Sequence, residues 1–191
     1  AGKQLMICSV FKTDVTRTAF IFWTDTLLNL REGKHPALLG PDMDGPTIEQ
    51  ATLEDLTQLT ELLSDLFSQE GDFTPDPVRQ MRGLRMLLEQ PNRGRIFVLR
   101  RNGRILGMIN LLFTISTAEG GVVILLEDLI IHQDFRGHGL GSKLLNHALN
   151  YAKSKDFKRI TLLTDRINAD AQRFYKRHGF FESAMLPMRY V

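Results

Sequence analysis

The sequence has little of what a disulfide-bonded or metal-binding protein needs. Its 191 residues include one cysteine, Cys8, which excludes an intrachain disulfide and a thiolate metal cluster. Its five histidines show neither HxxxH nor HExxH spacing, the spacings that bring two imidazoles to one metal ion. We therefore expect no metal site.

Strong net charge and long apolar runs are missing as well. Lys and Arg number 24 and Asp and Glu 22, which leaves a formal charge of +2, and there is no basic block. Nucleic acid is therefore not an expected partner. No apolar run approaches the ~20 residues that cross a bilayer, so no membrane association is expected. Residues 1–12 lack the basic, apolar and small-residue order of a secretory signal, and we expect a cytoplasmic location.

The composition divides the chain near residue 46. The segment GKHPALLGPDMDGP, residues 33–46, has three prolines and three glycines, which is typical of a linker or a wrapped loop. An independent domain of this length would have a small core. We expect residues 1–46 to be an extension that packs on the main domain or on a partner, and residues 47–191 to form one domain.

Apolar spacing predicts alternating strands and helices from Thr47 onward. Strands are expected at 47–52, on both sides of Asn102-Gly103, at 120–132, at 157–165 and in the closing segment 180–191. Helices are expected after a Thr52/Asp55 capping box, after Thr74-Pro75, from the glycine run to about Ser154, and at 168–179. Asn102-Gly103 is a strong hairpin signal. This order predicts an α/β (α+β) fold, a mixed, mostly antiparallel central sheet flanked by helices on both faces.

A glycine-rich run, RGHGLG, joins an apolar strand to a helix at residues 136–141. A helix N-terminus has unpaired N–H groups and a positive dipole end, and glycines allow an anion to approach closely. A Walker A loop is excluded because Gly141 is followed by Ser142 and then Lys143, and a Rossmann fingerprint requires a different glycine spacing. Taken alone, the run is compatible with a phosphate site or with a turn that binds nothing.

Three segments together resemble one family. Residues 136–141 fit R/Q-x-x-G-x-G/A, the acetyl-CoA pyrophosphate signature of the GCN5-related N-acetyltransferase (GNAT) superfamily. NADAQRFYKRHGF, residues 168–180, resembles its motif N-x-x-A-x-x-[FL]-Y-x-x-x-G-F, and LEDLIIHQDF, residues 126–135, resembles its central strand. The resemblance covers about residues 47–191 and implies the GNAT acyl-CoA N-acyltransferase fold.

The resemblance also implies acetyl-CoA as cosubstrate. Backbone amides of the glycine run would face the pyrophosphate, and the strand before it would pair with the pantetheine arm through backbone groups. Asn168 either touches the cosubstrate or caps its helix. The implied cofactor-binding residues are Leu129, Ile131, Arg136, Gly137, His138, Gly139, Gly141, Ser142, Asn168 and Tyr175.

Two carboxylates interrupt the apolar strand before the glycine run. A primary amine with a pKa near 10 is mostly protonated at neutral pH, so its acetylation benefits from a base. Glu127 is the first candidate and Asp128 the second, and burial next to a like charge would raise the pKa of either. On a regular strand the two would point to opposite faces. A structural role, paired with arginine or a helix N-terminus, is the alternative.

Tyr175 matches the motif tyrosine that the resemblance makes the acid for the leaving thiolate. A phenol with a pKa near 10 can donate a proton to a thiolate of comparable basicity. The alternative is a core tyrosine on an amphipathic helix.

The sequence thus predicts an acetyl-CoA-dependent N-acetyltransferase. The segment LED, residues 126–128, resembles the small-amine and polyamine branches of the family. The expected acceptor is therefore a primary amine of a small molecule or polyamine, acetylated by direct attack in a ternary complex. The alternatives are a protein lysine or N-terminal acetyltransferase and a non-catalytic acyl-CoA-binding module. The apolar closing segment would need cover as a sheet edge, which predicts a homodimer.

Overall fold

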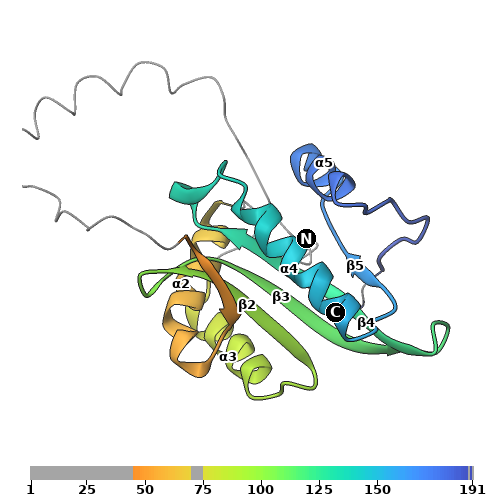
Figure 1. The fold of residues 1–191 in the computed structure, drawn as a ribbon, viewed down its shortest axis with the longest axis horizontal. Helices are drawn as coiled ribbons and strands as arrows, with labels where there is room; N and C mark the ends of the chain where they lie inside the picture. Colours follow the sequence, from red (N-terminus) through yellow and green to blue (C-terminus); the bar gives the residue numbers. More distant parts are fainter. Residues whose placement is uncertain (1–44, 70–74, 189, 191) are drawn as a thin grey trace, which may run out of the picture. The chain divides into compact units, whose positions relative to one another are not determined.

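The computed structural model describes residues 45–69, 75–188 and 190. Those from residue 46 onward belong to one compact unit. The secondary structure elements, shown in Figure 1, follow the order β1 (Thr47–Gln50), η1 (Leu53–Asp55), α2 (Leu56–Gln69), α3 (Pro77–Leu88), β2 (Gly94–Arg101), β3 (Arg104–Ser116), β4 (Gly121–Ile131), η2 (Gln133–Phe135), α4 (Leu140–Ser154), β5 (Ile160–Leu162) and α5 (Ala169–Arg177).

The five strands form one sheet in the order β1-β2-β3-β4-β5. Adjacent strands among β1 to β4 are antiparallel to one another, and β5 runs parallel to β4. The turn between β2 and β3 consists of Asn102 and Gly103, both with positive φ, as a two-residue hairpin requires. The predicted mixed, mostly antiparallel sheet and its hairpin are confirmed.

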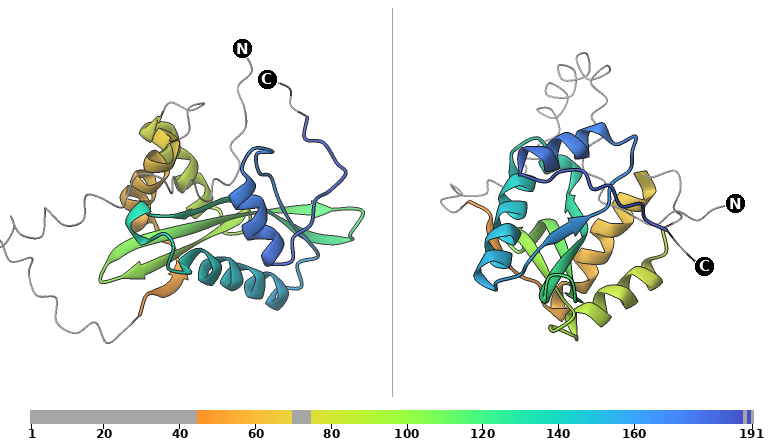
Figure 2. Two further views of the ribbon diagram at one scale, coloured as in Figure 1. Left: turned by 90° about the horizontal axis from the view of Figure 1, so that it is seen from above. Right: turned by 90° about the vertical axis from the view of Figure 1, so that its right-hand side faces the viewer.

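Helices cover both faces of this sheet (Figure 2). On one face, leucines of α2 and α3 pack with Ile96, Met108 and Ile130 of the sheet in a buried core. On α4, Leu144, Ala148 and Ala152 are buried, as their spacing predicts. The aromatic rings of Phe97 in β2 and Tyr151 in α4 lie 5.1 Å apart, so α4 packs on the sheet.

The helix starts follow local capping chemistry. The Thr52/Asp55 capping box is present, with the Thr52 amide donating to the Asp55 carboxylate at 2.9 Å. The predicted start of the next helix at Thr74-Pro75 is wrong. Asp76 is the N-cap, its carboxylate accepts from the Arg79 amide at 3.1 Å, and Pro77 follows it. The sequence TPDP contains two cap-proline pairs, and the second one starts the helix.

The predicted closing strand is also wrong for the residues that the structure describes. Residues 180–188 form neither helix nor strand. The Ser183 hydroxyl accepts from the Met185 amide, a local turn that competes with strand pairing. Pro187 lacks the N–H that a sheet ladder needs.

The predicted N-terminal extension, residues 1–46, lies almost entirely outside the described residues, so it stays a prediction. Within the part of the chain that the structure describes, no helix is long and apolar enough to cross a membrane.

Candidate active site

A β-bulge in β4 controls where the two strand carboxylates point. On β3, Ile109 and Leu111 face the same side, and they pair with Leu129 and Leu126 of β4. These β4 residues are three positions apart instead of two, so β4 holds one extra residue, Glu127. Regular alternation is interrupted there.

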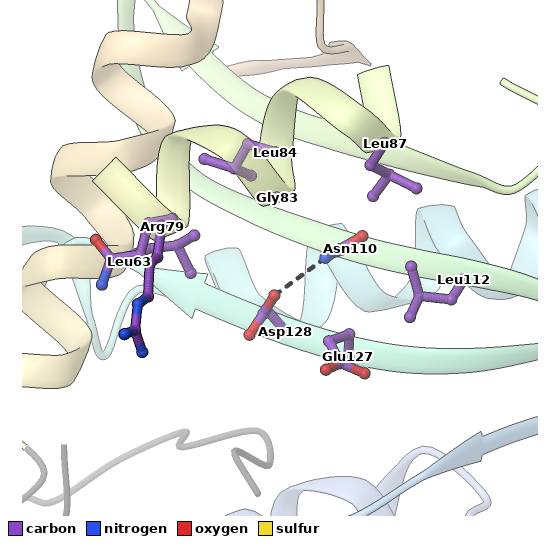
Figure 3. A pocket seen from close by; sticks show the side chains of 10 residues that line it. Leu63, Arg79, Gly83, Leu84, Leu87, Asn110, Leu112, Glu127 and Asp128 are labelled. Carbon is purple, nitrogen blue, oxygen red and sulfur yellow. Dashed lines mark hydrogen bonds between the residues drawn. The ribbon is translucent and has the colours of Figure 1, made fainter. Parts of the chain in front are cut away.

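Glu127 and Asp128 consequently line the same pocket, as Figure 3 shows. The expectation that they point to opposite faces is wrong, because it assumed regular pairing along the whole strand. The pocket, of about 280 Å³, lies near the lower end of small-molecule sites. Asp128 is on the sheet face that α2 and α3 cover, since Asn110, its partner on β3, alternates with the core residue Met108.

Burial shifts the acidity of both carboxyl groups. Burial, reinforced by the nearby charge of Asp128, raises the pKa of Glu127 to about 7. Burial raises the pKa of Asp128 to about 6, although its hydrogen bond from Asn110 acts in the opposite direction. A carboxylate with a pKa close to neutral pH is suited to general base chemistry.

Asn110 contributes a buried amide to this pocket. Its Nδ2 donates to Asp128 Oδ2 at 3.1 Å, which fixes the orientation of that carboxylate. Asn110 and Asp128 are 8% and 6% exposed. The sequence prediction missed Asn110, although a polar residue in the apolar run MINLL is the same kind of signal that revealed Glu127.

The remaining walls come from α2, α3 and β3. Their apolar part consists of Leu63, Leu84, Leu87 and Leu112. Arg79, Gln80 and Gly83, all on α3, complete the lining. None of these residues was predicted, but a glycine inside a helical pattern is an available signal.

The end of β4 has an incomplete partner strand. β5 pairs only with Ile124–Leu126, so, among the described strands, Leu129 and Ile131 have a neighbour only on the β3 side. Both side chains are buried. The backbone edge at Leu129 can accept an extended chain in the manner of an added strand, while the Ile131 carbonyl already accepts a hydrogen bond from Arg136.

The glycine run forms the N-terminus of α4. Gly139 is the N-cap with φ 73°, and no side chain of the described residues caps this helix end. Gly137 also has a positive φ, 80°, a conformation that favours glycine. A Cβ added at Gly137 or Gly139 would meet no described atom within 4 Å. The first amides of α4 are thus available to an anion.

Three further predicted residues belong to this helix start. His138 is exposed and Ser142 is half-buried. Arg136 Nε donates to the Ile131 carbonyl at 2.9 Å, so its side chain fastens the loop to the end of β4. Burial lowers the pKa of Arg136, but a guanidinium stays charged.

α5 carries the last two predicted residues. Asn168 caps it by accepting from the Ala171 amide at 3.0 Å. Tyr175 is buried, and its ring lies 5.6 Å from that of Phe180. Phe174, the residue before it, lies beside Gly141, where a Cβ would come within 3.7 Å of its ring. α5 therefore packs against the start of α4.

The structure thus assembles the predicted residues in two groups. Glu127 and Asp128 share the pocket that α3 helps to line, while Phe174 of α5 packs against Gly141 in the first turn of α4. Tyr175 is not among the residues that line the pocket. Among the described residues, no cluster of three or more His, Cys, Asp or Glu could hold a metal ion.

The sequence matches known acetyltransferases. A family model described as the acetyltransferase (GNAT) family matches residues 56–180. That match covers more than half of the chain, and the protein belongs to the GNAT family.

Individual relatives agree with this assignment. An uncharacterized N-acetyltransferase of Methanocaldococcus jannaschii is 28% identical over 141 residues, which are 73% of this chain and 62% of that protein. The aminoalkylphosphonate N-acetyltransferase of Salmonella typhimurium is 29% identical over 136 residues, 71% of this chain and 85% of that protein. A solved structure of a transcriptional regulator from Bacillus halodurans C-125 is 31% identical, with a TM-score of 0.65 over 76% of this chain and 100% of that one. The chain therefore spans less than two thirds of the first of these curated relatives.

Proposed function

We propose that the protein transfers an acetyl group from acetyl-CoA to the primary amine of a small molecule or polyamine, by direct attack in a ternary complex. The observation that carries this proposal is the bulge in β4, which brings two carboxyl groups with raised pKa values into one pocket. The GNAT family, to which the chain belongs, uses acetyl-CoA as cosubstrate.

The residues present fit acetyl-CoA. The N-terminus of α4 has no side-chain cap among the described residues, which suits a pyrophosphate held by backbone amides of Gly137–Ser142. The edge of β4 near Leu129 and Ile131, where β5 does not pair, suits the amide-containing pantetheine arm, although the Ile131 carbonyl already accepts from Arg136 Nε. Acetyl-CoA, when bound, supplies an acetyl group activated as a thioester.

Glu127 is the proposed general base. With a pKa of about 7, it is ionised in a large fraction of molecules at neutral pH, and it can take a proton from the acceptor ammonium directly or through one water. Asp128, oriented by its hydrogen bond from Asn110, places a second negative charge beside Glu127. A cationic amine is thereby attracted and then deprotonated at the same place.

Tyr175 is the proposed donor of a proton to the leaving sulfur. Tyr175 is buried and its ring contacts that of Phe180, which restricts the motion of the phenol. Its place on α5, which packs against the start of α4, supports this role, since α4 begins where the cosubstrate would be anchored.

A small acceptor is favoured by the size and lining of the pocket and by the name of one relative, an aminoalkylphosphonate N-acetyltransferase. The alternatives are a transferase that acts on a protein lysine or N-terminus and a non-catalytic acyl-CoA-binding module.

Purified protein incubated with acetyl-CoA and a panel of amines separates the three functions. We expect thiol release and an N-acetylated product with small amines. Product with peptides alone would favour a protein acceptor. Acetyl-CoA binding by calorimetry without thiol release would favour the binding module.

We also propose that two copies of the chain associate through residues 180–190. Exposed large apolar side chains are concentrated there: Phe181, Met185, Leu186, Met188 and Tyr190. β5, at one edge of the sheet, has three residues and a described partner on one side only. Light scattering should give a dimer mass for the full chain and a monomer mass for a variant with Phe181, Met185 and Met188 changed to serine. A monomeric wild-type chain would contradict this.

A further inference from the structure

Gly83 occupies a place where glycine is unfavourable. It lies in the middle of α3, where glycine lowers helix stability relative to alanine. It does not have positive φ, so no special backbone conformation requires it. A Cβ built there would meet no atom of the described residues within 4 Å. Close packing against those residues therefore does not require a glycine either.

Gly83 does line the pocket that contains the carboxylates (Figure 3). The missing side chain leaves space on the α3 side of this pocket. The neighbouring wall is apolar: Leu84 and Leu87 follow on the same helix, and Leu112 faces them from β3. Gly83 itself is exposed, so the space it leaves is an opening in the α3 wall next to these leucines.

The charged residues of the lining are two adjacent residues of β4 and one exposed residue of α3. Among the residues that line the pocket, the carboxylates are Glu127 and Asp128, adjacent on β4. Arg79 is cationic, and its guanidinium is paired with Asp76 at 2.9 Å on an exposed surface. If Glu127 and Asp128 both serve the reacting ammonium group, a second ammonium group among the leucines would find no further carboxylate in this lining, and burying it unpaired would be costly. For an anionic group, the cationic residue in this lining is Arg79, and its charge is already paired with that of Asp76.

We propose that Gly83 is a specificity-determining residue, whose missing side chain leaves room between the leucines for the apolar carrier of a single primary ammonium group. This inference rests on the proposed function and narrows its acceptor. Primary monoamines with a short alkyl or aryl carrier are the substrate class. Polyamines and aminoalkylphosphonates are poorer acceptors.

A homologous series of amines tests the substrate class. With the wild-type protein at pH 8, kcat/KM should rise about fourfold for each methylene from ethylamine towards hexylamine, the value expected for burying a CH₂ group. Hexane-1,6-diamine should be at least tenfold poorer than hexylamine, and 2-aminoethylphosphonate should be no better than ethylamine. A diamine or phosphonate that matches or exceeds hexylamine would overturn the inference.

Substitution of Gly83 tests its role. Gly83→Leu should raise KM for hexylamine at least tenfold and leave KM for ethylamine and for acetyl-CoA within about twofold. Arg82→Leu is the matched control, because Arg82 is an exposed neighbour on α3 outside the pocket lining, and it should resemble the wild type. Equal effects of Gly83→Leu on both amines, or no effect, would contradict a specificity role.

Direct binding separates this inference from the proposed function. Calorimetry with hexylamine should detect binding to the wild type and to Arg82→Leu, and at least tenfold weaker binding to Gly83→Leu. If no amine causes thiol release but this binding pattern holds, the transferase proposal fails and the monoamine site stands. If amines are acetylated but hexylamine binds all three proteins equally, Gly83 does not determine specificity.

Discussion

At the scale of residues, one extra position in β4 determines the chemistry of the pocket. Without the bulge, Glu127 would alternate away from Asp128 and face the other side of the sheet. With the bulge, both carboxyl groups line one partly buried pocket, and burial raises both pKa values. Asn110 then orients Asp128 by one hydrogen bond, and Glu127, with the higher pKa of the two, is the proposed base.

The pH dependence of activity tests this assignment. A base must be deprotonated to act, so kcat/KM for the amine should rise with pH through an inflection near 7, the pKa of Glu127. Glu127→Gln should remove this inflection and slow the reaction about 100-fold or more, as general base loss typically does. Asp128→Asn should move the inflection to lower pH, because the charge of Asp128 raises the pKa of Glu127. An unchanged inflection in Glu127→Gln would show that another group is the base.

Tyr175→Phe tests the proposed acid. The variant keeps the ring that packs near Phe174 and Phe180, so the fold should be retained. We expect kcat to fall about 10- to 100-fold while acetyl-CoA affinity, measured by calorimetry, stays within twofold. Equal turnover in both forms would mean that the thiolate leaves without this proton donor.

At the scale of elements, the start of α4 is the proposed pyrophosphate site, and glycine substitutions can test it. Gly139 has φ 73° and open space around its Cβ position, and Gly103 in the β2–β3 turn has φ 77° and the same open space. Alanine at either position should cost about 1–2 kcal/mol in unfolding free energy, because L-residues are strained there.

The functional effects of these two variants should differ. Gly139→Ala should weaken acetyl-CoA binding at least fivefold in calorimetry, since it alters the backbone that presents the amides. Gly103→Ala carries the same backbone strain in a turn outside the proposed binding segments and should leave the affinity unchanged. Equal affinity in both variants would count against α4 as the anion site.

Several elements were predictable because their signals are local. The Asn102-Gly103 turn and the Asn168 cap each depend on a few adjacent residues, and both are present. The bulge at Glu127 was not predictable, because it is a mismatch between two strands and alternation within one strand does not encode it. The start of α3 at Asp76 instead of Thr74 required a choice between two equivalent cap-proline pairs. The closing segment has strand-like residues, but a strand also needs a free edge of sufficient length, and β5 is short.

The residues that form the pocket walls could not be predicted from sequence motifs, for a related reason. Leu63, Leu84 and Leu112 are ordinary apolar positions in their own elements, and only the packing of α2 and α3 on the sheet brings them together. Gly83 and Asn110 are different. Each breaks the pattern of its element, and such interruptions were visible signals of a site.

At the scale of the whole molecule, the pocket carboxyls should make folding stability depend on pH. Their folded pKa values, about 7 and about 6, lie above the ordinary 4.5 and 3.8. The folded state therefore binds more protons than the unfolded state between about pH 4 and pH 7. As pH rises through that range, the contribution of these two groups to the free energy of unfolding decreases.

Urea unfolding at pH 5 and pH 8 measures this effect. The difference in stability between wild type and the Glu127→Gln, Asp128→Asn double variant should shift in favour of the variant as pH rises. If the difference in unfolding free energy did not depend on pH, these carboxyl groups would have ordinary pKa values in the folded protein. That result would contradict the proposal that burial raises the pKa of Glu127 to make it a base.

The central claim, that this chain acetylates a primary amine with Glu127 as base, is tested most directly by one assay. Wild type and Glu127→Gln are compared at pH 8 with acetyl-CoA and hexylamine, with the released thiol and the mass of the amine product both measured. We predict equal amounts of free CoA and N-acetylhexylamine with the wild type, and a rate about 100-fold lower with Glu127→Gln at unchanged acetyl-CoA affinity. Thiol release at the same rate in both proteins, or none above the buffer background in either, would contradict the claim.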